Sequence, residues 1–354
     1  MKTVDVLVIG TGPAGAAAAE KAAAGGLRVL AVDRREEIGL PVQCAEFIPL
    51  PMGSYARADG VLYQTISGMK SILPSGERTS TAFPGLMIDR AAFDQELAAR
   101  ARRAGAELML RTRLTALDLQ KKTAVLRTVD SDTVCTWRAL VAADGPHSTV
   151  AALSGLPELA TVHTRQYTVD LNRPYADTDI WLSNDYPGGY AWLFPKGNLA
   201  NLGLGLDKAH AADLKQPLDS LHAQLVREGL VGERVLSRTG GAIPVGGLRE
   251  HLAMGDVLFT GDAAGLTHPI TGAGIPAAVI SGERAGEACV HLLRDGDASA
   301  MQDYEEDMRD QFEVALDRAV ERRRWMAELW NTDRAEFDAM HRRGWIAFPE
   351  YFAE

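Results

Sequence analysis

The amino-acid sequence predicts an α/β protein in which a nucleotide-binding domain carries an inserted antiparallel β-sheet and is followed by helices. Residues 3–9 form an apolar run that leads into a glycine-rich turn and an alanine-rich stretch, the pattern of a strand, turn and helix. Residues 162–206 instead alternate β-favouring stretches with Pro, Gly and Asn, which is typical of antiparallel strands joined by turns. From residue 298 onward the pattern is mostly helical.

The first strand ends in the turn Gly10-Thr11-Gly12-Pro13-Ala14-Gly15. Gly10 allows a sharp turn off the strand, Gly12 allows the backbone to approach a diphosphate, and Gly15 allows the helix to pack closely on the sheet. A second strand over residues 27–32 ends in Asp33, which lies 18 residues past Gly15, close to the spacing of a ribose-binding carboxylate. This Rossmann-type βαβ unit predicts a bound dinucleotide. Its expected contacts are Gly10, Gly12, Pro13, Ala14, Gly15, Asp33 and Arg34.

The composition is that of an ordinary globular protein, with 354 residues of which 46% are hydrophobic and 24% charged. The net charge of −10 leaves no basic field to hold a polyanion, so we expect no nucleic-acid partner. No apolar run approaches the ~18 residues of a transmembrane helix, and the chain begins directly with a strand, so we expect a cytoplasmic protein. Cys44, Cys135 and Cys289 are odd in number and widely spaced, which predicts neither a disulfide framework nor a metal site.

The rest of the chain alternates between the two predicted domains. Residues 60–83 predict a hairpin that leaves the nucleotide domain, and residues 91–104 predict a helix that returns to it. Further strands are expected at 108–119, 123–129, 133–143, 234–240 and 256–262, and further helices at 218–228 and 275–295. The predicted nucleotide domain is therefore discontinuous. It comprises residues 1–60, 85–158 and 245–296, with a substrate-binding sheet domain at 61–84 and 159–244 and a helical segment at 297–354.

Two further glycine-aspartate turns make the expected dinucleotide FAD rather than NAD. Asp144-Gly145 follows one predicted strand, and Gly261-Asp262 follows another, ahead of the turn Gly272-Ala273-Gly274-Ile275 that opens a helix. An aspartate at such a position can accept a hydrogen bond from a ribityl hydroxyl, and the helix N-terminus can direct backbone N–H groups at the flavin N1–C2=O edge. We expect these residues, together with Cys44, Arg90 and Leu114, to contact an FAD that is held without a covalent bond.

The order of these motifs resembles FAD-dependent enzymes of the p-hydroxybenzoate-hydroxylase-like fold, over about residues 1–290. Within that group, residues 190–195 (Y-A-W-L-F-P) resemble the Y-x-W-x-F-P signature of the geranylgeranyl reductase family. Residues 41–46 (P-V-Q-C-A-E) resemble the P-V-x-C-x-E segment of that family, whose cysteine borders the flavin and the substrate. The resemblance implies a flavoenzyme that reduces isolated carbon–carbon double bonds of polyprenyl chains. The chain departs from the family in a shorter C-terminal end and in Phe47, where a glycine is usual.

Tyr190, Trp192 and Phe194 alternate along one predicted strand, so they share one face and can form an aromatic wall or an ordinary packed core. Cys44 lies in a loop with turn residues on both sides, where it can act as a proton donor or remain an inert thiol. His268 lies just before the flavin-edge turn, where a neutral imidazole can donate a proton. We expect Cys44, Tyr190, Trp192 and His268 to be catalytic, and Cys44, Tyr190, Trp192, Phe194 and Pro269 to contact the substrate.

Three classes of function remain open from the sequence. The first is an alkene reductase. The second is a flavin monooxygenase or halogenase acting on an aromatic or carrier-bound substrate, because the same strand also resembles the W-x-W-x-I-P of flavin-dependent halogenases. The third is a flavoprotein that only binds a prenyl or aromatic partner. No second G-x-G-x-x-G follows a strand, so we expect electrons from an external donor, either NAD(P)H at a transient site or a redox protein.

The basic run at residues 321–325 (E-R-R-R-W), with Trp330 and Trp345 beyond it, has two interpretations. It is either a solvated helix face or a surface at the pocket mouth that docks a lipid-borne substrate, a membrane surface or a partner protein. The second interpretation would make this cytoplasmic protein membrane-peripheral.

Overall fold

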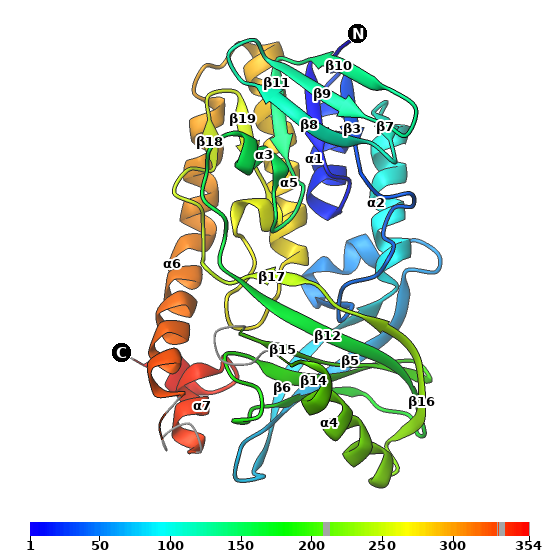
Figure 1. Cartoon of the computed structure of the whole chain (residues 1–354), viewed down its shortest axis with the longest axis vertical. Coiled ribbons are helices and arrows are strands. Elements are labelled where there is room, and N and C mark those ends of the chain that lie inside the picture. The colour runs from blue at the N-terminus through cyan, green and yellow to red at the C-terminus, as the bar shows by residue number, and fades with distance from the viewer. Residues whose placement is uncertain (208–212, 331, 333–336, 354) are drawn as a thin grey trace.

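The computed structural model places a nucleotide-binding end and a β-sheet end at opposite ends of the molecule, with one long helix running beside both (Figure 1). It describes residues 1–207, 213–330, 332 and 337–353. Positions 208–212 of the predicted sheet domain and positions 331, 333–336 and 354 of the predicted helical segment lie outside the described residues.

The N-terminal βαβ unit builds the centre of a six-stranded sheet. β2 (Val6–Ile9) lies between β11 (Ala139–Ala142) and β3 (Val29–Val32), and these three strands are parallel and fully buried. Burial on both faces explains why they read as continuous apolar runs rather than alternating patterns. The sheet is completed by β7 (Glu107–Met109) beside β3, and by β19 (Val257–Phe259) and β18 (Ala253–Met254) beyond β11.

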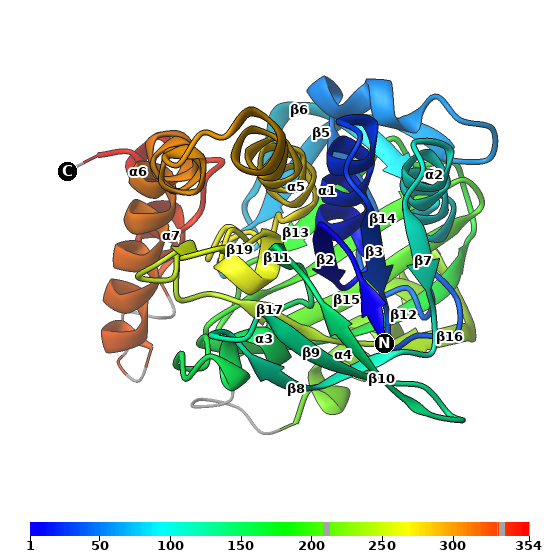
Figure 2. The ribbon, with the colours of Figure 1, turned by 90° about the horizontal axis from the view of Figure 1, so that it is seen from above.

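Helices cover one face of this sheet and a second, smaller sheet covers the other (Figure 2). α1 (Pro13–Ala24) lies between α2 (Arg90–Arg103) and α5 (Ile275–Val290), which ends in the π-helical turn η3 (His291–Asp295). α1 and α5 pack so closely that a Cβ atom on Gly282 would lie 2.1 Å from the carbonyl oxygen of Ala14. The small sheet has the order β1 (Lys2–Thr3), β10 (Asp132–Thr136), β9 (Thr123–Arg127) and β8 (Arg113–Asp118), and the short helix α3 (Thr149–Leu153) contacts β8.

The other end of the molecule is a nine-stranded sheet assembled from distant parts of the chain. The hairpin of β5 (Leu62–Ile72) and β6 (Arg78–Ile88) pairs in parallel with β13 (Asp177–Trp181) from the later β-rich region. The full order is β16 (Val231–Thr239), β12 (Thr161–Leu171), β15 (Leu199–Leu206), β14 (Tyr190–Lys196), β13, β5, β6 and β4 (Phe47–Pro49). β17 (Ala242–Pro244) also pairs with β12, and the short 3-10 helix η1 (Leu50–Ala56) follows β4.

The cross-strand register decides which residues share a face of this sheet. Trp192 on β14 lies opposite Ile180 and Gly203, and Gly203 in turn lies opposite Gln166 on β12. We call this the inner face, since it is turned toward the nucleotide-binding end. The outer face carries a leucine-rich core covered by α4 (Lys215–Arg227).

The C-terminal helices contact both the nucleotide-binding end and the β-sheet end of the molecule. α6 (Ala300–Leu329) contacts the six-stranded sheet through a hydrogen bond from the Tyr304 hydroxyl to the carbonyl oxygen of Phe259, 2.7 Å away. After α7 (Asp338–Gly344), the indole N–H of Trp345 donates to the buried hydroxyl of Ser71 on β5 at 3.1 Å, and the 3-10 turn η5 (Pro349–Tyr351) packs beside it. The predicted fold class is therefore confirmed, including a helical C-terminal part. Among the described residues, no helix is long and apolar enough to cross a membrane.

Candidate active site

The glycine turn between β2 and α1 fits the diphosphate of a dinucleotide. Gly10 has a φ of 98°, and a Cβ atom there would lie 2.3 Å from the carbonyl oxygen of Ala143 at the end of β11. A Cβ atom on Gly15 would lie 1.9 Å from the carbonyl oxygen of Gly10. A Cβ atom on Gly12, in contrast, would meet no atom within 4 Å, and no side chain in the described part of the chain caps α1. The helix N-terminus is therefore open on the side where a phosphate would bind.

Asp33 lies beside this turn, as its place after β3 predicts. Its Oδ2 accepts hydrogen bonds from the backbone N–H and the hydroxyl of Thr11, at 2.9 and 3.0 Å. Its Oδ1 accepts from the backbone N–H of Arg35 at 2.8 Å. Arg34 is exposed and lines an open hollow together with Arg113 on β8. The ribose-binding role of Asp33 stays a prediction, because these contacts show only that its carboxylate is fixed at the turn.

Asp144 follows β11 at the same edge of the sheet, but its carboxylate is engaged by α3. Oδ1 accepts from the Ser148 hydroxyl at 2.6 Å, and Oδ2 accepts from the backbone N–H groups of Thr149 and Val150 at 2.6 and 3.1 Å. Gly145 has a φ of 85°, which allows the chain to leave the strand toward this helix. Asp144 thus organises the turn, and its contact with FAD remains a prediction.

The second glycine-aspartate turn and the start of α5 come together as the sequence predicts. Gly261 and Asp262 form the 3-10 turn η2 (Gly261–Ala264), where the Thr267 hydroxyl donates to Asp262 Oδ1 at 2.5 Å. A Cβ atom on Gly274 would lie 3.3 Å from that same oxygen, so the carboxylate lies against the N-terminus of α5. Burial raises the pKa of Asp262. The predicted contacts Gly272, Ala273 and Ile275 lie in the same segment.

The Cys44 loop is held against the inner face of the nine-stranded sheet. The Gln166 side-chain amide donates to the carbonyl oxygen of Cys44 at 3.0 Å, and the Thr239 hydroxyl donates to that of Val42 at 2.8 Å. Cys44 as a whole residue is half-buried. Burial raises its pKa, although the guanidinium of Arg90, the first residue of α2, favours the thiolate. Cys44 is therefore held mainly as a protonated thiol at neutral pH.

Trp192 is connected to Cys44 by hydrogen bonds through one intervening residue, Gln166. Its indole lies across Gly203, where a Cβ atom would be 2.4 Å from Trp192 Cζ2, and its N–H donates to Gln166 Oε1 at 3.1 Å. Only 6% of Trp192 is exposed, so it is a supporting part of the aromatic face rather than an open wall. The half-buried Tyr190 ring lies 5.7 Å from it, between centroids.

Phe194 extends the aromatic face in the other direction. Its ring lies 6.0 Å from that of Phe47, which in turn stacks on Phe83 at 5.6 Å between centroids. The Phe47 ring occupies the space over Gly85, where a Cβ atom would lie 2.2 Å from it. The residue that stands at the family's usual glycine position therefore fills this end of the inner face.

His268 lies in the loop between η2 and α5, next to the aromatic face. Its Nδ1 accepts from the backbone N–H groups of Ile270 and Thr271, both at 3.3 Å, which leaves Nε2 to carry the proton. Burial lowers the pKa of His268 to about 4, so the ring is neutral at pH 7. The Tyr190 hydroxyl donates to the carbonyl oxygen of Thr271. Pro269 is buried in the same loop.

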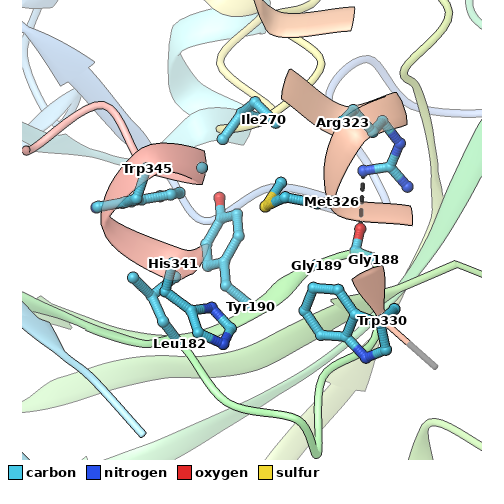
Figure 3. A pocket seen from close by; sticks show the side chains of 11 residues that line it. Leu182, Gly188, Gly189, Tyr190, Ile270, Arg323, Met326, Trp330, His341 and Trp345 are labelled. Carbon is cyan, nitrogen blue, oxygen red and sulfur yellow. Dashed lines mark hydrogen bonds between the residues drawn. The ribbon is translucent and has the colours of Figure 1, made fainter. Parts of the chain in front are cut away.

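A small pocket of about 20 Å³ lies where this loop, the nine-stranded sheet and the C-terminal helices meet (Figure 3). Tyr190 lies in it between Trp345 and Met326, and the Tyr190 and Trp345 rings are 4.8 Å apart between centroids. Arg323 on α6 closes one side by donating to the carbonyl oxygen of Gly188 at 2.7 Å. The lining is predominantly apolar, and the space has room for about one water molecule.

The sequence interpretation included Glu46 in the Cys44 segment but missed the partners that hold this loop, which are Gln166, Lys196 and Asn201. Glu46 is only 3% exposed, and its carboxylate bonds Lys196 and Asn201 of the inner face. A signal was present for Asn201, which is the polar residue within the otherwise apolar, buried strand β15. Leu114 differs from the other predicted contacts, since its side chain packs into the core of the nucleotide domain from β8. Within the described ranges, no group of three His, Cys, Asp or Glu residues is placed to hold a metal ion.

Two family models match the chain. A pyridine nucleotide-disulphide oxidoreductase model matches residues 4–196, which is more than half of the chain. A geranylgeranyl reductase catalytic domain model matches residues 160–243, the region that contains β12 to β16.

Curated relatives agree with these models. The chain is 33% identical over 334 residues to a digeranylgeranylglycerophospholipid reductase of Methanocella arvoryzae, covering 89% of this chain and 85% of the relative. It is 37% identical over 339 residues to digeranylgeranylglycerophospholipid reductase 1 of Methanopyrus kandleri, covering 88% of each.

Solved structures show the same relationship. A geranylgeranyl bacteriochlorophyll reductase-like protein from Thermoplasma acidophilum superposes with a TM-score of 0.83 at 27% identity, over 95% of each chain. The flavin-dependent halogenase CmlS superposes with a TM-score of 0.75 at 17% identity, over 95% of this chain and 67% of that one, a likeness that extends to the fold alone. The sequence prediction of the family is confirmed: the chain belongs to the geranylgeranyl reductase family of FAD-dependent oxidoreductases.

Proposed function

We propose that this protein reduces carbon–carbon double bonds of a polyprenyl-type substrate, with Cys44 as the proton source. The observation that carries the proposal is the attachment of the Cys44 loop to the aromatic inner face through Gln166, which bonds both Cys44 and Trp192. Reduction of an isolated alkene adds a hydride to one carbon and a proton to the other. When bound, FAD supplies the hydride-transfer chemistry.

Three parts of the chain carry groups that would hold FAD. Gly12 leaves open space at the N-terminus of α1 for the diphosphate, and Asp33 lies at the strand end where the ribose would bind. Asp262 lies against the N-terminus of α5, whose backbone dipoles favour negative charge on the flavin edge. These residues would hold the diphosphate, the ribose and the flavin, respectively.

Cys44 has the properties that a proton donor requires. Its raised pKa keeps the thiol protonated at neutral pH, and the neighbouring Arg90 guanidinium would stabilise the thiolate that remains after transfer. His268 is the second candidate donor, with a neutral ring that carries its proton on Nε2. Of the two, Cys44 lies on the loop that the inner face holds in place.

The inner face and the C-terminal helices supply a water-poor surface for a hydrocarbon. Aromatic faces such as Tyr190 and Phe194 stabilise positive charge that develops on an alkene carbon during protonation. Trp345 and Met326 cover the Tyr190 end. Water must be excluded from this surface because it would otherwise compete with the alkene carbon for the proton.

The substrate and the electron donor complete the proposal. The two curated relatives are named for a phospholipid that carries geranylgeranyl chains, which supports a lipid substrate presented at a membrane surface. Electrons would come from an external donor, NAD(P)H at a transient site or a redox protein. A lipid substrate would require the protein to associate peripherally with a membrane.

The proposal is tested with pre-reduced enzyme mixed anaerobically with a polyprenyl lipid in a stopped-flow instrument. Cys44→Ser should preserve folding and the flavin spectrum but slow substrate-dependent flavin reoxidation by roughly 10²- to 10⁴-fold, the usual contribution of general acid catalysis. Cys135→Ser is the matched control, because that thiol is fully buried in the nucleotide domain. If Cys44→Ser keeps the wild-type rate, Cys44 is not the proton source. Trp192→Ala should remove the partner of Gln166 and lower the stability of the protein, because the indole is buried.

A further inference from the structure

Glu46 combines two features that cost free energy in a folded protein. It is 3% exposed, so its carboxylate is removed from water, and its backbone has a φ of 71°, in the left-handed region that disfavours residues other than glycine. Unfavourable features that are retained together at one residue often mark a functional site, where the surrounding structure holds the residue in place. Glu46 lies two residues after Cys44.

The carboxylate of Glu46 is fully engaged by donors from three elements. Lys196 at the end of β14 donates to both oxygens, at 2.9 and 2.8 Å. Asn201 on β15 donates at 2.8 Å, and the backbone N–H of Arg90 at the start of α2 donates at 2.9 Å. Lys196 also lies 4.4 Å from the centroid of the Tyr63 ring, which covers the pair. This arrangement joins the nucleotide domain to the strand that carries Tyr190, Trp192 and Phe194.

The same residues determine the surroundings of the Cys44 sulfur. The backbone N–H of Glu46 donates to Cys44 Sγ at 3.2 Å, a contact that depends on the left-handed turn at residue 46. Asn201 donates to the carbonyl oxygen of Ala45 at 3.3 Å, so it holds both the backbone and the carboxylate of this turn. The Arg90 side chain, whose backbone bonds Glu46, also contacts the thiol.

We propose that Glu46 is a positioning residue: its carboxylate, held by Lys196 and Asn201, fixes the turn that orients the Cys44 thiol. Because Lys196 lies on β14, its ion pair with Glu46 also fixes the position of the thiol relative to the aromatic strand. The catalytic part of this inference rests on the proposed function, but the orientation of the thiol does not.

The direct test measures the alkylation rate of Cys44 by iodoacetamide in the purified full-length protein. Cys135 and Cys289 are fully buried, so the fast phase should report Cys44 and should vanish in Cys44→Ser. Glu46→Gln should accelerate alkylation several-fold, because the thiol loses its fixed turn and the neighbouring negative charge. Asn201→Ala, which keeps the ion pair, should give a smaller change in the same direction. The matched control is Asp179→Asn, which alters a buried carboxylate on the outer face of the same sheet and should leave the rate unchanged.

A double-mutant cycle separates positioning from a general structural effect. Glu46→Gln should slow anaerobic substrate-dependent reoxidation by on the order of 100-fold, as expected of a misplaced catalytic group. In the Cys44→Ser background the same change should cost nothing further, whereas Asp179→Asn should have the same small effect in both backgrounds.

The outcomes distinguish the two proposals. Unchanged alkylation in folded Glu46→Gln and Asn201→Ala variants, or additive rate losses in the cycle, would overturn the role of Glu46. If wild-type enzyme is not reoxidised by any polyprenyl lipid, the proposed function fails, and the alkylation rates still decide whether Glu46 orients the thiol.

Discussion

Trp192 lies flat on Gly203, and a Cβ atom on Gly203 would be 2.6 Å from Trp192 Cε2. The glycine therefore allows the indole to reach across β15 and donate its N–H to Gln166 on β12, which in turn holds the Cys44 carbonyl. One glycine on a neighbouring strand thus connects the aromatic signature to the Cys44 loop.

Replacement of Gly203 by Ala should displace the indole and break this connection. We expect a loss of about 1–3 kcal/mol in the free energy of unfolding, typical of overpacking, together with faster alkylation of Cys44. The matched control is Gly205→Ala on the same strand, where the new Cβ would lie at ordinary contact distances of 3.5 Å from Thr164 Cγ2 and 3.9 Å from the His163 carbonyl oxygen. Denaturant unfolding and alkylation rates measure both effects, and equal losses in the two variants would show that the Trp192 contact has no special role.

Gly12→Ala should separate cofactor binding from folding. The new Cβ would meet no protein atom within 4 Å, so the fold should be retained, but the methyl group would occupy the approach of the diphosphate. We expect the purified Gly12→Ala protein to carry little bound flavin, measured by absorbance. After FAD removal, its melting temperature should equal that of the wild-type protein treated in the same way. Gly15→Ala should instead destabilise the protein itself, because its Cβ would lie 1.9 Å from the Gly10 carbonyl oxygen. Full FAD occupancy in a folded Gly12→Ala variant would contradict the assignment.

The order of secondary structure was largely predictable, but its distribution between sheets was not. The apolar run 133–143 was expected to be one strand, yet it forms β10 and β11, which belong to different sheets on either side of Trp137. Residues 108–119 likewise divide into β7 and β8. Apolar periodicity reports that a segment is buried, but it carries no information on which layer the segment joins.

The candidate site likewise has a part that the sequence predicts and a part that it does not. The glycine turns and the aromatic strand were predictable, because their chemistry depends on residues within a few positions of one another. The contacts of the Cys44 loop were not, because Gln166 and Lys196 are 122 and 150 residues away from their partners Cys44 and Glu46. Such pairs depend on how the nine-stranded sheet is assembled.

The C-terminal segment should prove essential to the core of the molecule. Trp345 is 3% exposed and packs with Trp192 and Ile270, and the nearby Arg323 is paired with Asp207 at 3.0 Å. We therefore expect Trp345→Ala to lower the free energy of unfolding by about 3–5 kcal/mol, the usual cost of truncating a buried aromatic residue. Phe352→Ala is the control, because that ring is 58% exposed and should cost little. A wild-type melting temperature for Trp345→Ala would favour the docking-surface interpretation of this segment.

His268 should make stability depend on pH in a defined direction. Its pKa is about 4 in the folded protein and 6.5 in the unfolded chain, so the unfolded state binds the proton first. The stabilisation from a neutral His268 is therefore complete above about pH 6.5 and is lost as the pH falls toward 4, by roughly 3 kcal/mol in total. His268→Asn keeps an acceptor for the backbone N–H groups of Ile270 and Thr271 but does not titrate. Unfolding curves of the two proteins should diverge only below pH 6.5, and parallel curves down to pH 4 would refute this account.

The most direct test of the central claim is the mass of the product after one anaerobic turnover of pre-reduced enzyme with a geranylgeranyl lipid in deuterated water. The account predicts that each reduced double bond gains two hydrogens, both of them deuterium, because the N5–H of the reduced flavin and the Cys44 thiol both exchange with the solvent. It also predicts that Cys44→Ser yields little product in the same time, while Cys135→Ser matches the wild type. A lipid of unchanged mass, or one that gains mass only when oxygen is admitted, would contradict the assignment of this chain as a double-bond reductase.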